Sequence, residues 1–247
     1  MKNVFIFDVD GTLTPSRDAI DPFFFGWFLD WTRRGKKEVY LATGSDYIKS
    51  QEQLGNAILN SVSAVFSCAG NAIYSKGQLK YENNWKLTSE QYQWLNEQLF
   101  FSSFPLKTGR HIENRIGLVN FSVVGRNADK DQRQKYVEFD KRTGERRKIA
   151  ASFNLKFGST AVAQVAGETG IDIVQPGHDK GQIAKYFNEP DVHVYFFGDQ
   201  IVPGGNDYPL AEELRKQFNS GHSKFTKVKV NGWRDTWNFL KTMENTK

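Results

Sequence analysis

The chain has 247 residues, of which 39% are hydrophobic and 14% aromatic, and its formal net charge is +5. These values allow one large globular domain or two modest ones, and they exclude an intrinsically disordered chain. The mild positive charge fits an ordinary solvated surface or a site that collects anions such as phosphates. The sequence contains neither a block of Lys and Arg residues nor an aromatic-basic recognition motif, so it does not indicate nucleic acid as a partner.

Cysteine content and hydropathy bear on the compartment. The single cysteine, Cys68, excludes an internal disulfide and fits a reducing environment, where it serves as a small buried residue. The most apolar stretch, residues 23–29 (FFFGWFL), is far shorter than the ~20 residues that span a membrane, so it predicts the buried face of a helix. The apolar run before Asp8 is too short for a signal peptide. We expect a soluble, cytoplasmic protein without a membrane partner.

The first part of the chain alternates strands and helices. Strands are expected at residues 4–7, 62–66 and within EVYLATGSD, residues 38–46. A helix over 23–34 is entered through Asp21 and Pro22, and a second over 45–55 is closed by Gly55. This alternation predicts a parallel sheet with helices on its faces.

The middle of the chain has a different pattern. Thr88 and Gln91 form a capping-box pattern at the start of a helix over 87–100, and NRIGLVNFSVVGR, residues 114–126, alternates as one long strand. Two charged helices follow at 129–142 and 145–156, divided by Gly144, and two strands at 161–166 and 170–174. These elements predict a separate α+β unit.

The α/β pattern returns after PGHDKG, residues 176–181, which we expect to be a hinge. Strands are expected at 192–199 and 225–230, and helices at 208–218 and 233–243. The predicted fold class is therefore α/β. A core with a parallel sheet is formed by residues 1–82 and 182–247, and an α+β domain, residues 83–181, is inserted in it.

Two carboxylates directly follow the first strand in FIFDVDGTLTP, residues 5–15. Buried like charges need a cation or a partner, so Asp8 and Asp10 indicate a reactive or metal-binding site. Alternate residues of an extended strand point to opposite faces, so the chain must turn after Asp8, and Gly11 permits this. Asp8 can then face a phosphorus atom while Asp10 donates or accepts a proton, and such hard oxygen ligands suit Mg²⁺.

Other polar groups are expected at the same edge of the sheet. Asp199 follows a buried strand directly, and Thr43, Gly44 and Ser45 follow the second strand. In open α/β sheets the ligand crevice lies at the carboxyl ends of the strands. The turn can supply a hydroxyl and backbone N–H groups to a phosphoryl group.

This pattern resembles the haloacid dehalogenase-like (HAD) phosphotransferase superfamily, whose signature is a DxDGT loop, as in DVDGT. DVDGTLTPSRDAIDP, GSDYIKSQEQLG, NRIGLVNFSVVGR and YFFGDQIVPGGND together look like the eukaryotic-type phosphomannomutases over nearly the whole chain. The resemblance implies a Rossmann-like HAD core with a C2-type cap. It also implies Mg²⁺-dependent interconversion of hexose 6-phosphate (mannose 6-phosphate) and hexose 1-phosphate, a hexose bisphosphate activator, a role in GDP-mannose biosynthesis, and a homodimer through the cap.

The resemblance also implies a role for each matching residue. Asp8 would become an aspartyl phosphate, and Asp10 would be the general acid/base and give its backbone carbonyl to the metal. Asp199 would complete the metal site, with Asp207 as a further ligand or a neighbour of the ligands. Substrate contacts are implied at Arg17, Arg115, Arg126, Arg133 and Asp172, and a lysine that neutralises the phosphoryl group at either Lys180 or Lys49.

The chain departs from the family pattern at three places. Gly170 stands where the family usually has Ser, two residues before the Asp172 position, and CAGN, residues 68–71, replaces the usual Glu-Asn-Gly. The family's additional cation site is not recognisable in YPLAEELRK, residues 208–216. These departures bear on sugar preference and on mutase activity.

Two alternatives to the mutase stay open. A Mg²⁺-dependent sugar-phosphate phosphatase would share the aspartyl-phosphate step and use water as the acceptor. A sugar-phosphate-binding regulator would keep the fold alone, and intact Asp8, Asp10 and Asp199 speak against it. Retention of the arginines favours the mutase, because a mutase must hold a phosphate at each end of the sugar in turn.

Overall fold

The computed structural model describes residues 1–218 and 223–245, and the chain divides into two compact units. The core unit contains Met1–Glu82, Lys180–Pro203 and Asp207–Lys247, and the cap unit contains Asn83–Asp179 and Gly204–Asn206. None of the helices described is both long enough and apolar enough to cross a membrane.

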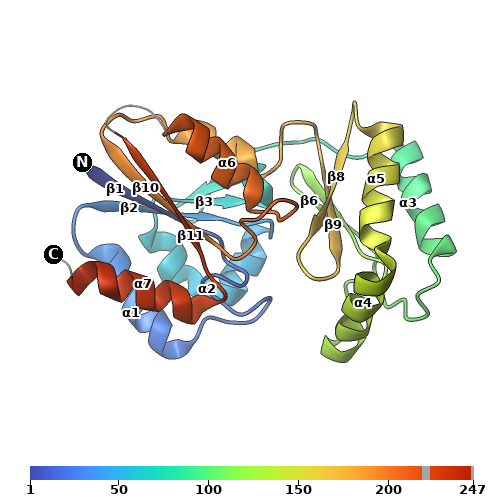
Figure 1. The fold of residues 1–247 in the computed structure, drawn as a ribbon, viewed down its shortest axis with the longest axis horizontal. Coiled ribbons are helices and arrows are strands. Elements are labelled where there is room, and N and C mark those ends of the chain that lie inside the picture. The colour runs from blue at the N-terminus through green and yellow to red at the C-terminus, as the bar shows by residue number, and fades with distance from the viewer. Residues whose placement is uncertain (219–222, 246–247) are drawn as a thin grey trace. The chain divides into compact units, whose positions relative to one another are not determined.

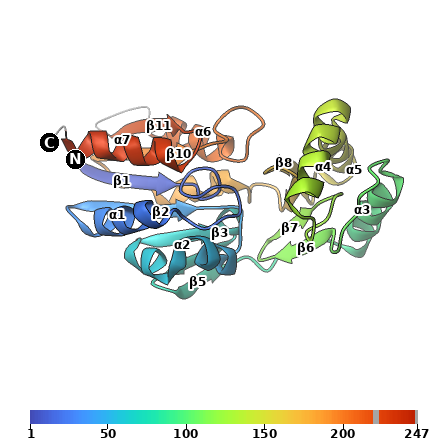
Figure 2. The same ribbon diagram turned by 90° about the horizontal axis from the view of Figure 1, so that it is seen from below.

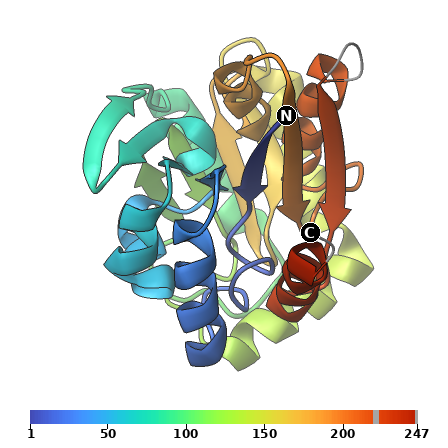
Figure 3. The ribbon, with the colours of Figure 1, turned by 90° about the vertical axis from the view of Figure 1, so that its left-hand side faces the viewer.

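The core unit is built on a seven-stranded sheet with helices on both faces (Figures 1 and 3). The strands lie in the order β11 (Lys224–Lys229), β10 (Val192–Gly198), β1 (Lys2–Phe7), β2 (Lys37–Ala42), β3 (Ala64–Ser67), β4 (Ala72–Ser75) and β5 (Gln78–Glu82). The five strands from β11 to β3 are parallel, as the α/β prediction requires. The antiparallel strands β4 and β5 were not predicted; their tight turn places Lys76 and Gly77 at positive φ.

Strand β1 is buried on both faces, as expected for a central parallel strand. Phe5 and Phe7 pack in a cluster with α1 (Pro22–Arg33), α2 (Tyr47–Ser61) and α7 (Trp233–Asn245). Val4 and Ile6 point to the other face, toward the short helix η2 (Lys180–Tyr186) and α6 (Tyr208–Gln217). The end of β1 is therefore fixed from both sides, and Asp8 follows it directly.

Two predictions about the core helices need correction. The apolar run at 23–29 is not one buried face, because Phe24 and Phe28 are fully buried whereas Phe23 is 81% exposed. Helix α2 begins after its N-cap Asp46 but does not end at Gly55. Gly55 (φ 73°, ψ 155°) interrupts the helical backbone, and the helix continues to Ser61 because Ile58 and Leu59 are again buried in the core.

The cap unit has a four-stranded antiparallel sheet with three helices on one face (Figure 2). Its strands lie in the order β6 (Ile112–Arg115), β7 (Leu118–Phe121), β9 (Gly170–Val174) and β8 (Val162–Ala166). The helices are α3 (Ser89–Phe101), α4 (Lys130–Thr143) and α5 (Glu145–Phe157). Phe121 and Ile173 pack into the apolar cluster that also contains Phe153 of α5. The neighbouring residues of each strand lie on the opposite, polar face of the sheet.

Local signals set the limits of the cap helices. Thr88 and Gln91 form the expected capping box of α3, and Gly144 adopts φ 66° between α4 and α5. The prediction of one long strand over 114–126 was wrong. The chain turns at Gly117 (φ 60°) and forms the β6–β7 hairpin, and the apolar alternation continues through the turn and hides it.

Candidate functional site

A buried lysine joins two carboxylates at the end of β1. The Asp8 N–H donates to the Phe197 carbonyl of β10 at 2.9 Å, which holds Asp8 at the carboxyl ends of two neighbouring strands. Lys180 Nζ donates to Asp8 Oδ1 at 2.6 Å and to Asp207 Oδ1 at 2.5 Å. Lys180 and both carboxylate side chains are at most 5% exposed. Asp207 also accepts from the Gln200 N–H at 3.1 Å.

The charges of this cluster are not balanced by the protein alone. Burial, and then the charge of Asp207, raise the pKa of Asp8 well above its usual value, although Lys180 opposes them. Burial lowers the pKa of Lys180, but the carboxylates of Asp207 and Asp8 outweigh it and the net shift is upward. Lys180 is therefore a cation at neutral pH, and it compensates only one of its two carboxylate partners.

A third carboxylate completes an acidic cluster that could hold a metal ion. Asp8, Asp199 and Asp207 each offer an oxygen, and the three oxygens lie within 4.8 Å of one another. Burial raises the pKa of Asp199 as well. A Cβ at Gly11 (φ 75°) would lie 2.8 Å from Asp199 Oδ2, so the glycine both makes the turn and leaves room for this carboxylate. Three carboxylates around one lysine form a donor set that fits a hard divalent cation.

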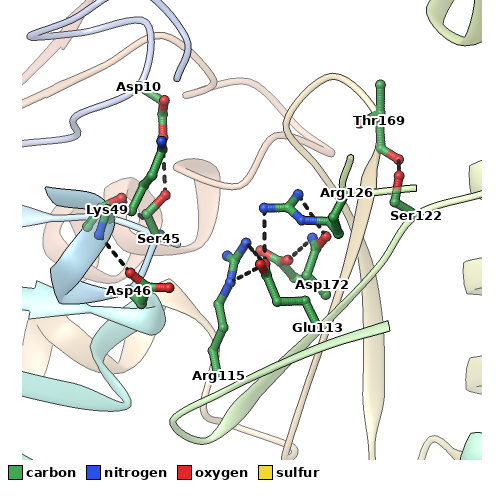
Figure 4. A network of polar contacts seen from close by, with 12 residues as sticks. Asp10, Ser45, Asp46, Lys49, Glu113, Arg115, Ser122, Arg126, Thr169 and Asp172 are labelled. Carbon is green, nitrogen blue, oxygen red and sulfur yellow. Dashed lines mark hydrogen bonds and ion pairs between the residues drawn. The ribbon is translucent and has the colours of Figure 1, made fainter. Parts of the chain in front are cut away.

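Asp10 is held by donors from three segments. Oδ1 accepts from the Arg17 N–H at 2.6 Å and from Gln53 Nε2 at 3.0 Å, and Oδ2 accepts from Ser45 Oγ at 3.3 Å. Figure 4 shows the Ser45 hydroxyl turned toward Asp10. Gly11 N–H donates to the Thr14 carbonyl at 2.9 Å and closes the loop. The loop therefore presents Asp10 in one fixed orientation.

Gln53 is a site residue that sequence reasoning missed. Its side chain is buried, and Nε2 also donates to Thr14 Oγ1 at 3.1 Å. Its backbone carbonyl accepts from the Ile20 N–H at 2.9 Å, next to the break in α2 at Gly55. A glutamine within a helical pattern looks like a solvated residue, and only the early glycine indicated a special geometry here.

The turn after β2 carries Thr43, Gly44 and Ser45, as predicted. Ser45 N–H donates to Thr43 Oγ1 at 3.0 Å. The carbonyls of Thr43 and Ser45 accept N–H groups of Ala69 at 2.8 Å and Cys68 at 2.9 Å. Cys68 and Ala69 both have positive φ, a strained backbone for residues with side chains, so the CAGN segment fixes the turn at a conformational cost.

The structure distinguishes the two candidate lysines. Lys49 Nζ pairs with Glu52 at 2.8 Å on the exposed side of α2, whereas Lys180 is the lysine that contacts Asp8. Arg17 has φ 59°, and its backbone N–H takes part in the site by donating to Asp10.

Within the cap unit, three predicted residues lie on the polar face of the sheet. Figure 4 shows Arg115 and Arg126 converging on Glu113, which accepts from Arg115 Nε at 2.9 Å and pairs with Arg126 Nη2 at 3.0 Å. Asp172 on β9 accepts from Asn120 Nδ2 at 2.7 Å, and Arg126 Nη1 donates to Asn120 Oδ1 at 3.2 Å. Glu113 and Asn120 were not predicted.

Electrostatics couple this cluster. Burial, and then the charge of Arg115, lower the pKa of Arg126, while Glu113 opposes them. Burial raises the pKa of Asp172, and Arg115, Asn120 and Arg126 limit the rise. The guanidinium groups lie close enough to repel each other, which is the arrangement expected of a site for an anion.

Arg133 lies farther along the cap. From α4 it donates to Thr169 Oγ1 at 3.2 Å and pairs with Glu168 Oε2 at 3.0 Å, both in the turn between β8 and β9. No described contact joins Arg133 to Arg115 or Arg126, although Arg133 lowers the pKa of Arg126 through its charge.

A model of the eukaryotic phosphomannomutase family matches residues 28–232. The chain belongs to the eukaryotic phosphomannomutase family. Relatives named phosphomannomutase include one from Dendrobium officinale, 34% identical with 86% of each chain covered. Another, from Encephalitozoon cuniculi, is 35% identical, with 85% of this chain and 84% of the relative covered.

Comparison with solved structures shows that this chain has a HAD-like fold. The trehalose-6-phosphate phosphatase C-terminal domain of C. albicans superposes with a TM-score of 0.67 at 16% identity, covering 99% of this chain and 92% of that domain. A haloacid dehalogenase-like hydrolase from Bacteroides thetaiotaomicron has a TM-score of 0.60 at 14% identity, with both chains fully covered. Asp8 and Asp10 of the DxDGT loop precede the range that the family model matches.

Proposed function

We propose that this chain interconverts hexose 6-phosphate and hexose 1-phosphate, with mannose as the sugar, through an aspartyl phosphate. The observation that carries the proposal is the buried Asp8–Lys180–Asp207 cluster with Asp10 held separately on the same loop. These groups provide a nucleophile, a cation and a separate acid/base for phosphoryl transfer. Several reactions use such a site, and membership of the phosphomannomutase family favours the mutase reaction.

Asp8 is the proposed nucleophile. Its Oδ1 is held by Lys180, so Oδ2 is the oxygen that attacks phosphorus. A bond forms between Oδ2 and phosphorus as the bond from phosphorus to the sugar oxygen breaks. The ammonium of Lys180 stabilises the carboxylate before the attack and the charge on the phosphoryl group after it.

Asp10 is the proposed general acid and base. Protonated Asp10 gives its proton to the departing sugar oxygen, and the resulting carboxylate later takes the proton of the attacking hydroxyl. The donors Gln53, Ser45 and the Arg17 N–H hold this carboxylate in place. Water as the acceptor in place of the sugar hydroxyl would give the phosphatase reaction.

Mg²⁺ is the proposed metal. Asp8, Asp199 and Asp207 would hold it, with the Asp10 backbone carbonyl as a further ligand implied by the family resemblance. When bound, Mg²⁺ supplies positive charge beside the transferring phosphoryl group. Gly11 and Lys180 keep the carboxylates in place around it.

The arginines of the cap are proposed to bind the phosphate that is not reacting. Arg115 and Arg126 provide two guanidinium groups beside each other, and Asp172 provides an acceptor for sugar hydroxyls. Arg133 and Arg17 would add further contacts to the substrate. A mutase needs such a grip, because its bisphosphate intermediate must be retained and reoriented before it returns to Asp8.

The test is incubation with mannose 1-phosphate, Mg²⁺ and a hexose bisphosphate activator, followed by assays of mannose 6-phosphate and free phosphate. The proposal expects mannose 6-phosphate as the main product. Free phosphate alone would identify a phosphatase. If neither product forms, the sugar-phosphate-binding regulator becomes the better interpretation. Chelation should abolish turnover and added Mg²⁺ should restore it, because the carboxylate cluster lacks a full complement of positive charge.

A homodimer through the cap is part of the same proposal. Phe100 and Phe101 at the end of α3 are 79% and 76% exposed, and Leu155 of α5 is 91% exposed. A second copy of the chain would cover these apolar side chains. Light scattering should give twice the chain mass of 28.3 kDa, and the double change Phe100→Ser and Phe101→Ser should give the monomer. The expected cytoplasmic location is checked by cell fractionation.

A further inference from the structure

Asn120 stands at the centre of the polar face of the cap sheet. In the strand register it lies opposite Glu113 on β6 and opposite Asp172 on β9. Residues paired in this way across antiparallel strands point to the same face. Only 4% of Asn120 is exposed, so its side chain is buried, and both of its neighbours in the register are charged.

Hydrogen bonds fix the orientation of the Asn120 amide. Nδ2 donates to Asp172 Oδ1 at 2.7 Å, and Oδ1 accepts from Arg126 Nη1 at 3.2 Å. An ionised carboxylate only accepts and a guanidinium only donates, so the opposite orientation of the amide would lose both bonds. Asn120 thus joins a negative and a positive group in one geometry.

Gly170 provides the space that Asn120 occupies. A Cβ at position 170 would lie 2.6 Å from Asn120 Nδ2 and 3.2 Å from the Ala166 carbonyl oxygen. Gly170 does not have a left-handed backbone, so other residues could adopt its conformation. The neighbouring amide, and not the backbone, is what requires glycine here.

We propose that Asn120 is a positioning residue of the cap's substrate-binding face, and that Gly170 determines specificity by leaving room for it. This inference rests on the proposed function, which assigns Arg126 to a phosphate and Asp172 to sugar hydroxyls. Asn120 holds these two groups in one relative orientation, so that phosphate binding and hydroxyl recognition occur together. Because Gly170 offers no hydroxyl, discrimination between hexoses here depends on the orientation of Asp172.

The experiment is a double-mutant cycle with Asn120→Ala, Gly170→Ala and both together. Each single change should raise KM for mannose 1-phosphate by about tenfold to a hundredfold, the effect of losing hydrogen bonds to charged groups. The value of kcat should change less, because the reacting atoms are elsewhere. The double variant should be little worse than Asn120→Ala alone, since the added methyl group then meets only the Ala166 carbonyl oxygen at 3.2 Å.

A specificity readout separates positioning from a merely structural role. The ratio of kcat/KM for mannose 1-phosphate to that for glucose 1-phosphate should fall toward one in both single variants, because Asp172 is free to rotate. Asn120→Asp, of almost the same shape, should show the same losses because it places a carboxylate against Asp172. Gly26→Ala in α1 is the matched control: apart from its chain neighbours and the backbone of its own helix, no atom lies within 4 Å of the Cβ position, and kinetics should be unchanged.

Additive losses in the cycle, an unchanged KM in Gly170→Ala, or an unchanged sugar ratio would overturn the proposal. Binding of mannose 1-phosphate by calorimetry, in an Asp8→Asn background that cannot turn over, repeats the cycle without chemistry. Wild-type binding without turnover would reject the proposed function alone. An affinity for mannose 1-phosphate that is unchanged by Asn120→Ala and by Asn120→Asp would reject the inference alone.

Discussion

The two polar clusters of this chain differ in their balance of charge and are built in different ways. In the core unit, Lys180 contacts Asp8 and Asp207, and Asp199 completes the group of three carboxylates. All four residues stand in loops or at the ends of elements. In the cap unit, Arg115 and Arg126 share one glutamate, Glu113, along the face of a sheet, and Asp172 interacts with both arginines electrostatically. The first cluster suits a cation and a reacting phosphoryl group, and the second suits an anion that does not react.

The difference separates chemistry from recognition. A change in the core cluster should affect every phosphate ester, because each must pass through Asp8. A change in the cap cluster should affect only esters large enough to carry a second recognised group. Two substrates are therefore enough to test whether the core cluster carries the chemistry and the cap cluster the recognition: mannose 1-phosphate and a small activated aryl phosphate.

The largest effect is expected for Asp8→Asn. Phosphoryl transfer from both substrates should fall below about one percent of wild type, because an amide is not a nucleophile toward phosphorus. Initial rates measure this, and circular dichroism checks that the fold is retained. Asp18→Asn, an exposed aspartate downstream on the same segment, is the control and should be fully active. Residual activity above that level would place the nucleophile elsewhere.

Lys180→Met should reduce stability most. It leaves Asp8 and Asp207 buried without a cation, at a cost of about 3 kcal/mol in the free energy of unfolding. Burial already raises the pKa of Asp8 above its unfolded value, and loss of Lys180 raises it further. A raised carboxyl pKa destabilises the fold as pH rises through the range between the unfolded and folded pKa, so acidification should recover part of the loss.

Urea unfolding at pH 5 and pH 7 measures this effect. The exposed pair of Lys49 with Glu52 offers the control, because Lys49→Met should change stability by less than about 0.5 kcal/mol. Equal losses in the two variants would mean that the Lys180 cluster is not the buried, unbalanced site described here.

Arg126→Ala should separate the two substrates. Its kcat/KM for mannose 1-phosphate should fall by about ten- to a hundredfold, because bonds from a guanidinium to a phosphate are each worth about 1.5–3 kcal/mol. Hydrolysis of the aryl phosphate should hardly change. Arg147→Ala, on the exposed side of α5, is the control. Equal losses on both substrates, or none, would favour the phosphatase.

The smallest effect is expected for Gln53→Met. Asp10 loses one hydrogen bond and keeps those from Arg17 N–H and Ser45, so kcat should fall by about tenfold with KM unchanged. Both substrates should be affected equally, because Gln53 belongs to the core cluster. Gln51→Met, two residues earlier on the same helix, should have no effect. A change confined to mannose 1-phosphate would contradict the division between the clusters.

The core cluster could largely be predicted from sequence because its residues follow apolar runs. Asp8 and Asp199 stand directly after buried strands, and neighbouring parallel strands end at the same edge. Gln53 could not be predicted, because a one-residue break in α2 looks like the end of a helix. The choice between Lys180 and Lys49 needed the fold, since either lysine could reach a phosphate in principle.

The cap cluster was only partly predictable. Arg115, Arg126 and Asp172 came from family resemblance, and no local pattern indicated which of them touch. Asn120 and Asp172 are 52 positions apart in sequence and meet through the register of β7 and β9. The place of Asn120 in β7 depends on the turn at Gly117. Because the 114–126 segment reads as one strand, the sequence did not reveal which of its residues share a face.

The position of β1 in the core sheet also constrains the order in which the chain folds. Its neighbours are β2, made soon afterward, and β10, whose Val192 pairs with Lys2. All strands and helices of the cap are synthesised after β2 and before β10. During synthesis one edge of β1 therefore stays open until the cap has emerged, and pairing across such a separation is slow. An open strand of Phe and Ile residues can associate with other chains, so the nascent core is the stage at which this protein is most exposed to aggregation and most in need of a chaperone.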